Sequence, residues 1–65
     1  MYNLKSYREI FEIAKNNKEF TICLKDLSIK ESLRVIDFIT GLTFINGKLE
    51  KISASTFKVE EGNKG

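Results

Sequence analysis

The sequence lacks several residue types, and each absence excludes a class of protein. It contains no histidine, no proline and no tryptophan, and its single cysteine is Cys23. One cysteine cannot form an internal disulfide, and without histidine it cannot complete a Cys/His zinc site. The missing histidine also removes the usual general base near neutral pH and the partner of a serine or cysteine nucleophile. We therefore expect a protein that is not an enzyme and uses no metal or other cofactor.

Length and charge are typical of one small soluble domain. A chain of 65 residues buries only about 60% of its unfolded surface, so domains of this size commonly depend on a staple or a partner. Disulfide and zinc staples are excluded, which leaves a partner. Eleven basic side chains nearly balance nine acidic ones. No stretch approaches the roughly 18 apolar residues of a membrane span, and the first residues lack the layout of a signal peptide. We expect a cytoplasmic protein.

The first element predicted by the sequence is a helix over residues 7–16. Ser6 and Glu9 have the Ser-x-x-Glu spacing of a capping box, in which two unpaired backbone N–H groups are satisfied reciprocally. The apolar residues that follow recur at the spacing of one helix face. They are Tyr7, Ile10, Phe11 and Ala14.

A second helix is predicted over residues 29–40. Ser28 and Glu31 repeat the Ser-x-x-Glu box at its start, and Gly41 is placed to end it in a left-handed cap conformation. Its apolar residues cover more than the single stripe of a surface helix. They are Ile29, Leu33, Val35, Ile36, Phe38, Ile39 and Leu42. A second apolar surface indicates contact with another layer or chain, and we expect a dimer.

Alternation between apolar and polar side chains predicts the strands. Residues 19–25 alternate with period two, and we expect one face of this strand to be buried. That face carries Phe20, Ile22 and Leu24. A short strand over residues 2–5 precedes the first helix, and a last strand covers residues 56–60. Residues 61–65 are a polar tail, so one domain fills the chain, with its globular part at about residues 4–60.

Asn46–Gly47 predicts a β-hairpin, because both residues tolerate the positive φ of a two-residue type I′ turn. Strand-like segments over residues 43–45 and 48–52 flank this dipeptide. Together with the last strand, which follows a turn at residues 53–55, they predict a three-stranded meander. The expected fold is a two-layer α+β sandwich in the order β-α-β-α-β-β-β, with two helices packed on a mostly antiparallel sheet.

Several short motifs occur in a recognisable order. The strand at residues 19–25 leads into Leu24-Lys-Asp-Leu27, and the second helix carries Arg34-Val-Ile-Asp-Phe-Ile-Thr-Gly41. Asn46-Gly47, Lys51-Ile52 and Phe57-Lys-Val59 follow. In this order the motifs resemble the C-terminal core of SepF, the cell-division protein that ties FtsZ filaments to the membrane. The most specific piece is the R-x-I-D-F-x-x-G stretch, and the resemblance covers about residues 4–59.

The resemblance implies a dimeric adaptor that binds the short C-terminal tail of FtsZ at the division septum. In the family, a lysine six residues before a phenylalanine contributes to tail binding, and Lys51 and Phe57 match that pair. We place Phe44 with them in the peptide site. Gly41 matches a family glycine associated with contacts between dimers, and whether dimers go on to polymerise stays open. To dimer or inter-dimer contacts we also assign the apolar residues around it, Val35, Phe38, Ile39 and Leu42. Family members reach the membrane through an N-terminal helix that these 65 residues do not contain.

Each candidate residue also has a purely structural interpretation. Gly41 could serve only as a helix cap, and Phe57 could be a core residue. Lys51 could be simply solvated, and Cys23 is better explained as an inert, half-buried thiol than as a reactive one.

Two other binding functions stay open. The domain could bind a small ligand as ferredoxin-like regulatory domains do, although the sequence has no glycine-rich phosphate loop. Aromatic side chains on a sheet could stack the bases of single-stranded nucleic acid. A net charge of +2 without a basic stripe gives little attraction for phosphate, so we expect no nucleic acid and place peptide binding first.

Overall fold

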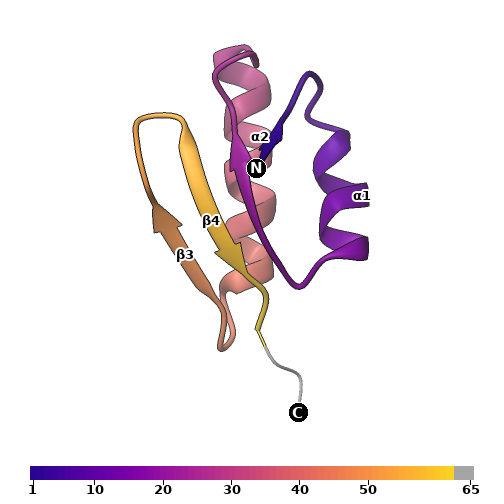
Figure 1. The fold of residues 1–65 in the computed structure, drawn as a ribbon, viewed down its shortest axis with the longest axis vertical. Coiled ribbons are helices and arrows are strands. Elements are labelled where there is room, and N and C mark those ends of the chain that lie inside the picture. The colour runs from indigo at the N-terminus through magenta and orange to yellow at the C-terminus, as the bar shows by residue number, and fades with distance from the viewer. Residues whose placement is uncertain (63–65) are drawn as a thin grey trace.

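The computed structural model describes residues 1–62, which form two helices against a four-stranded sheet (Figure 1). In chain order the elements are β1 (Tyr2–Asn3), α1 (Glu9–Asn16), β2 (Glu19–Cys23), α2 (Ile29–Thr43), β3 (Lys48–Lys51) and β4 (Thr56–Glu60). The predicted α+β class with two helices is confirmed. The last part of the predicted polar tail, residues 63–65, lies outside the described residues.

The sheet has the strand order β1-β2-β4-β3. β1 pairs with β2 in parallel, whereas β4 pairs antiparallel with both β2 and β3. The sheet is therefore mostly antiparallel, as predicted, and its one parallel pair has α1 as the crossover connection. A helix follows each of the first two strands and a hairpin comes last. This order differs from the β-α-β-β-α-β order of ferredoxin-like domains.

The predicted hairpin at Asn46–Gly47 is wrong. Helix α2 continues through Gly41 to Thr43, and Phe44 keeps helical dihedrals with φ −59° and ψ −40°. Asn46 has a φ of 63°, and the N–H of Gly47 donates to the carbonyl oxygen of Thr43 at 3.2 Å. The dipeptide thus ends α2 in a left-handed conformation, which is the other common use of a positive φ. Gly41 is not the cap, residues 43–45 form no strand, and the meander is reduced to the β3–β4 hairpin.

The two predicted capping boxes behave differently. At α2 the Ser28 hydroxyl accepts a hydrogen bond from the Glu31 N–H at 3.2 Å, as predicted. At α1 the Glu9 carboxylate accepts from the Lys5 N–H at 2.7 Å, while Ser6 accepts from Arg8 at 3.3 Å. Both α1 box residues bind backbone N–H groups, but they stabilise a turn, so regular helix begins at Glu9 instead of residue 7.

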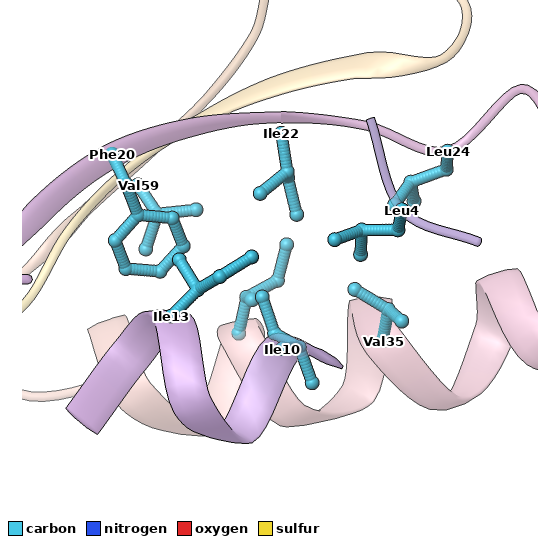
Figure 2. Packing of buried hydrophobic residues seen from close by; sticks show 9 residues of the cluster. Leu4, Ile10, Ile13, Phe20, Ile22, Leu24, Val35 and Val59 are labelled. Carbon is cyan, nitrogen blue, oxygen red and sulfur yellow. The ribbon is translucent and has the colours of Figure 1, made fainter. Parts of the chain in front are cut away.

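The core lies between the sheet and the two helices (Figure 2). It consists of Leu4, Ile10, Ile13, Phe20, Ile22, Leu24, Val35, Ile39 and Val59. The predicted inner face of β2 is confirmed, although regular pairing ends at Cys23. Among the described residues no polar or charged residue is buried. Burying each such aliphatic side chain contributes roughly 1.5–3 kcal/mol, so apolar burial stabilises the fold.

Candidate functional site

Lys51 and Phe57 are brought together by the β3–β4 hairpin. They are cross-strand partners, and the other partner of Phe57 is Ile22 on β2. Directly opposed side chains in a sheet point to the same face. Because Ile22 is completely buried under the helices, Lys51 and Phe57 lie on the helix-covered face. Phe57 packs against the core but keeps part of its surface exposed, and Lys51 is exposed.

Helix α2 runs in the same direction as β4, as two contacts at their ends show. The Leu24 N–H, before α2, donates to the carbonyl oxygen of Ser55, just before β4, at 2.8 Å. Beyond the other end of α2, a Cβ built on Gly47 would lie 2.7 Å from the carbonyl oxygen of Glu60. Phe57, near the start of β4, is therefore level with the N-terminal half of α2.

One flank of α2 is turned toward α1. The Phe38 ring lies edge-on to the Phe11 ring of α1, with centroids 5.0 Å apart, and Arg34 lies over the Tyr7 ring. Ile36 precedes Phe38 by two residues, which corresponds to a rotation of about 200° around the helix axis. Ile36 therefore projects from the opposite flank. Since α2 also contacts β3 and β4, this second flank faces the hairpin side of the sheet.

The hairpin-side flank carries an apolar stripe that the chain itself leaves uncovered. Ile29, Leu33 and Ile36 have the i, i+4, i+7 spacing of one helix face. Ile29 is 82% exposed and Leu33 is 55% exposed, while Ile36 is half-buried. The apolar surplus of this helix is therefore a real surface feature. An exposed apolar surface of this kind is typical of a binding site.

We name the combination of this stripe with the cross-strand pair the α2–hairpin surface. It consists of Ile29, Leu33, Ile36, Lys51 and Phe57. Chemically it offers aliphatic and aromatic contact area next to one ammonium group. It suits a ligand that has apolar side chains beside a carboxylate.

Phe44 lies away from Lys51 and Phe57, at the opposite end of α2. It is 81% exposed and lines an open pocket of about 520 Å³. The other lining residues are Gly41, Leu42, Ile45, Asn46, Glu61 and Gly62. The structure thus groups Phe44 with the predicted contact residues Gly41 and Leu42 instead of with the predicted peptide-binding pair.

The remaining predicted contact residues lie at different depths. Val35 and Ile39 have no exposed surface and belong to the core of the single chain. Phe38 is half-buried between the helices, whereas Gly41 is exposed. A second copy of the folded chain can therefore reach Phe38, Gly41 and Leu42, but not Val35 or Ile39.

The open face of the sheet is polar. At its centre the Lys58 ammonium group lies 3.3 Å from the Glu19 carboxylate and 3.9 Å from that of Glu60. The pairing register places Thr21 and Glu50 beside Lys58 on the same face. Phe20 and Phe57 point to the helix side, so the strands within residues 2–60 present no aromatic side chain for base stacking on the open face.

The perturbed titratable groups lie outside the α2–hairpin surface. The Lys5 ammonium group is 2.8 Å from the Asp26 carboxylate, and both residues are exposed. Their hydrogen bond lowers the pKa of Asp26 and raises the pKa of Lys5. The pair ties the segment after β1 to the loop before α2. It has a structural explanation and gives no indication of proton-transfer chemistry.

Residues 1–62 lack metal-binding and membrane-spanning features. This part of the chain holds no group of three side chains suited to bind a metal ion. None of its helices combines the length and apolar character needed to cross a bilayer. Cys23 is a free, buried thiol on β2.

The sequence analysis assigned Val35 and Ile39 to contacts between copies, but both belong to the core of the single chain. Two apolar rows were available, and spacing alone does not choose between them, because the polar row of Lys30, Arg34 and Asp37 borders both. The structure buries Val35 and Ile39 and exposes Ile29 and Leu33.

No protein-family model matches the chain, and no curated protein matches it.

Proposed function

We propose that this chain is a SepF-like adaptor core that binds the C-terminal tail of FtsZ through the α2–hairpin surface. The observation that carries the proposal is the pairing of Lys51 with Phe57. Lys51 and Phe57 match a lysine and a phenylalanine that are six residues apart in the SepF family. The β3–β4 hairpin places these two residues directly opposite each other. The flank of α2 that faces the hairpin carries the exposed stripe of Ile29 and Leu33, which gives a tail peptide an apolar surface.

The binding mode combines side-chain burial with an available sheet edge. Among the described strands β3 pairs only with β4, so its outer edge keeps free backbone N–H and C=O groups. An extended peptide can add to such an edge by backbone hydrogen bonds, while pockets for alternate side chains give specificity. Lys51 then meets an acidic residue of the tail, and Leu33 and Phe57 take its apolar side chains.

Homodimer formation is part of the proposal and uses a different region. Gly41, Leu42 and Phe44 lie together at the C-terminal end of α2, where exposed apolar area remains. We assign contacts between copies, and any polymer of dimers, to this end of the helix. The adaptor works without catalysis or cofactor, in the cytoplasm at the division septum, and reaches the membrane through a segment outside these residues.

A fluorescence-anisotropy titration of a labelled FtsZ tail peptide tests the proposal. Wild-type protein should bind saturably in the micromolar range. Lys51→Glu/Phe57→Ala should weaken binding at least about tenfold, because a central aromatic anchor that is a hot spot contributes about 2 kcal/mol or more. Because Phe57 also packs against the core, the single variant Lys51→Glu is measured as well, and circular dichroism monitors folding.

The matched control is Lys48→Glu/Phe44→Ala, which makes the same chemical changes at two exposed positions outside the α2–hairpin surface. Because Phe44 lies in the proposed contact region between copies, the oligomeric state of this control is compared with that of wild type. Binding by this control within about twofold of wild type would support the α2–hairpin surface. Equal loss in both double variants would contradict a site confined to the α2–hairpin surface. A folded wild-type chain that binds no tail would mean that the resemblance reports the fold alone.

A further inference from the structure

Three aromatic side chains form a row where α1 and α2 meet. The Tyr7 and Phe11 ring centroids are 6.5 Å apart, those of Phe11 and Phe38 are 5.0 Å apart, and both pairs are edge-on. The guanidinium carbons of Arg8 and Arg34 each lie 5.2 Å from the Tyr7 centroid. We name these five residues the aromatic–arginine ridge. Cation–π contact with one ring holds two cations close together.

Neither guanidinium has a carboxylate partner within residues 1–62. The ion pairs of this part of the chain all use Lys5 or Lys58, and neither arginine side chain donates a hydrogen bond there. Both arginines are exposed. An arginine that stacks on an aromatic ring uses the face of its guanidinium, which leaves the N–H fork free for a planar anion such as a carboxylate. The ridge therefore holds two positioned and unused anion-binding groups.

Apolar surface lies directly beside these cations. Phe11 is 46% exposed although it has two aromatic neighbours, and Tyr7 and Phe38 are half-buried. A ligand that satisfies the whole ridge carries carboxylates next to an apolar side chain. The ridge also has its own acids, Glu12 four residues after Arg8 and Asp37 three residues after Arg34. These carboxylates oppose a continuous polyanion such as a nucleic acid, but they leave room for one or two well-placed acidic side chains.

From this geometry we propose that the aromatic–arginine ridge is a second docking site, which takes an acidic peptide segment of a partner protein. Acidic side chains of the segment bind Arg8 and Arg34, and an adjacent aromatic or aliphatic side chain packs on Phe11. The ridge lies on the α1 flank of α2, whereas the α2–hairpin surface lies on the opposite flank. Both sites can therefore be occupied at once, and the chain can connect two different partners.

The proposal is tested with a fluorescein-labelled probe peptide, Glu-Glu-Phe-Glu-Glu-Leu-Glu-Glu. Binding is followed by anisotropy, and the site is mapped by amide chemical-shift changes in ¹⁵N-labelled protein. We expect shift changes at Tyr7, Arg8, Phe11, Arg34 and Phe38, with little change at Lys51 and Phe57. The charge-reversal variant Arg8→Glu/Arg34→Glu should bind at least about tenfold more weakly, because it replaces two charge-assisted contacts with repulsion.

A control with the same change in net charge separates the ridge from general attraction. Lys25→Glu/Lys48→Glu reverses two exposed lysines outside the ridge, and it should keep probe binding within about threefold of wild type. The milder variant Arg8→Gln/Arg34→Gln serves if charge reversal disturbs folding. The proposal is overturned by equal loss in the lysine control, by shift changes centred on Lys51 and Phe57, or by no saturation at about 1 mM probe.

Discussion

Replacing each of two glycines by alanine should change stability in opposite directions. Gly41 lies within α2 and is exposed, and a Cβ added there meets no atom within 4 Å. Glycine inside a helix is about 1 kcal/mol less favourable than alanine, mainly because its unfolded state is more flexible. Gly41→Ala should therefore raise the free energy of unfolding by roughly 0.5–1 kcal/mol. For a domain of this size that is an increase of about 2–8 °C in Tm.

Gly47→Ala should have the reverse effect. A Cβ at this position would lie 2.6 Å from the Thr43 Cα and 2.7 Å from the Glu60 carbonyl oxygen. Both neighbours are backbone atoms, so the end of α2 and the end of β4 must separate to admit a methyl group. Overpacking of this kind costs about 1–3 kcal/mol. The expected loss in Tm is at least about 4 °C.

Thermal and urea unfolding followed by circular dichroism measure both effects. Each variant is compared with wild type at several protein concentrations, because a dimer would make Tm depend on concentration and Gly41 lies in the proposed contact region. A Gly41→Ala variant that is less stable than wild type at every concentration would refute the reasoning. It would mean that α2 ends at Gly41 in a left-handed conformation, as the sequence pattern alone predicts.

Three further predictions concern a cap, the core and an ion pair. Ser28→Ala removes the hydroxyl that accepts from the Glu31 N–H and should cost about 1 kcal/mol in urea unfolding. Ile39→Ala creates a cavity at a side chain with no exposed surface; a loss of about 2–5 kcal/mol should show as partial unfolding by circular dichroism, and a loss below about 1 kcal/mol would contradict the packing. Asp26→Asn removes the bond to Lys5. Because the pKa of Asp26 is lowered in the folded state from 3.8, the wild type keeps this contribution at neutral pH and loses it as pH falls through the folded pKa. The difference in Tm between wild type and Asp26→Asn should therefore shrink toward pH 2, and a constant difference would argue against the pair.

Features set by neighbouring residues were predictable from the sequence. The Ser28 cap depends on a residue three positions away, and the burial of Phe20, Ile22 and Leu24 follows from the alternation within one strand. Both were confirmed. Lys51 and Phe57 were assigned to one site only from a family resemblance, and their cross-strand pairing was not predicted; it results from a hairpin connection of four residues, 52–55.

Features decided by distant parts of the chain were not predictable in this way. Asn46–Gly47 satisfies a hairpin turn and a helix end equally well, because both need a positive φ. In the structure Gly47 packs closely against the backbone of Glu60 in β4, which is compatible with a helix end at this position. This contact joins residues that are distant in the sequence, so no local sequence pattern could predict it. The wrong prediction for Phe44 has the same cause. Phe44 was expected on a strand of the hairpin, but in the structure it lies directly after α2.

The choice between the two apolar rows of α2 has the same origin. Phe38 lies against Phe11, so the position of α1 fixes how α2 is rotated over the sheet. The packing of one helix thus decides which residues of the other remain available for binding. The sequence could indicate that α2 has an extra apolar surface, but only the arrangement of the helices shows that Ile29 and Leu33 form it.

The central position of β4 has a consequence for how the chain folds during synthesis. β4 is the last strand to be made, yet it joins β2 to β3 (Figure 1). Before Thr56–Glu60 emerges, the only sheet pairing available in the described chain is the two-residue contact of β1 with β2. An isolated pair of strands of that length does not persist in water, and contacts between residues distant in sequence form slowly. A nascent chain stopped before β4 therefore exposes the aliphatic side chains of β2 and α2, and folding waits for the final strand to close the sheet.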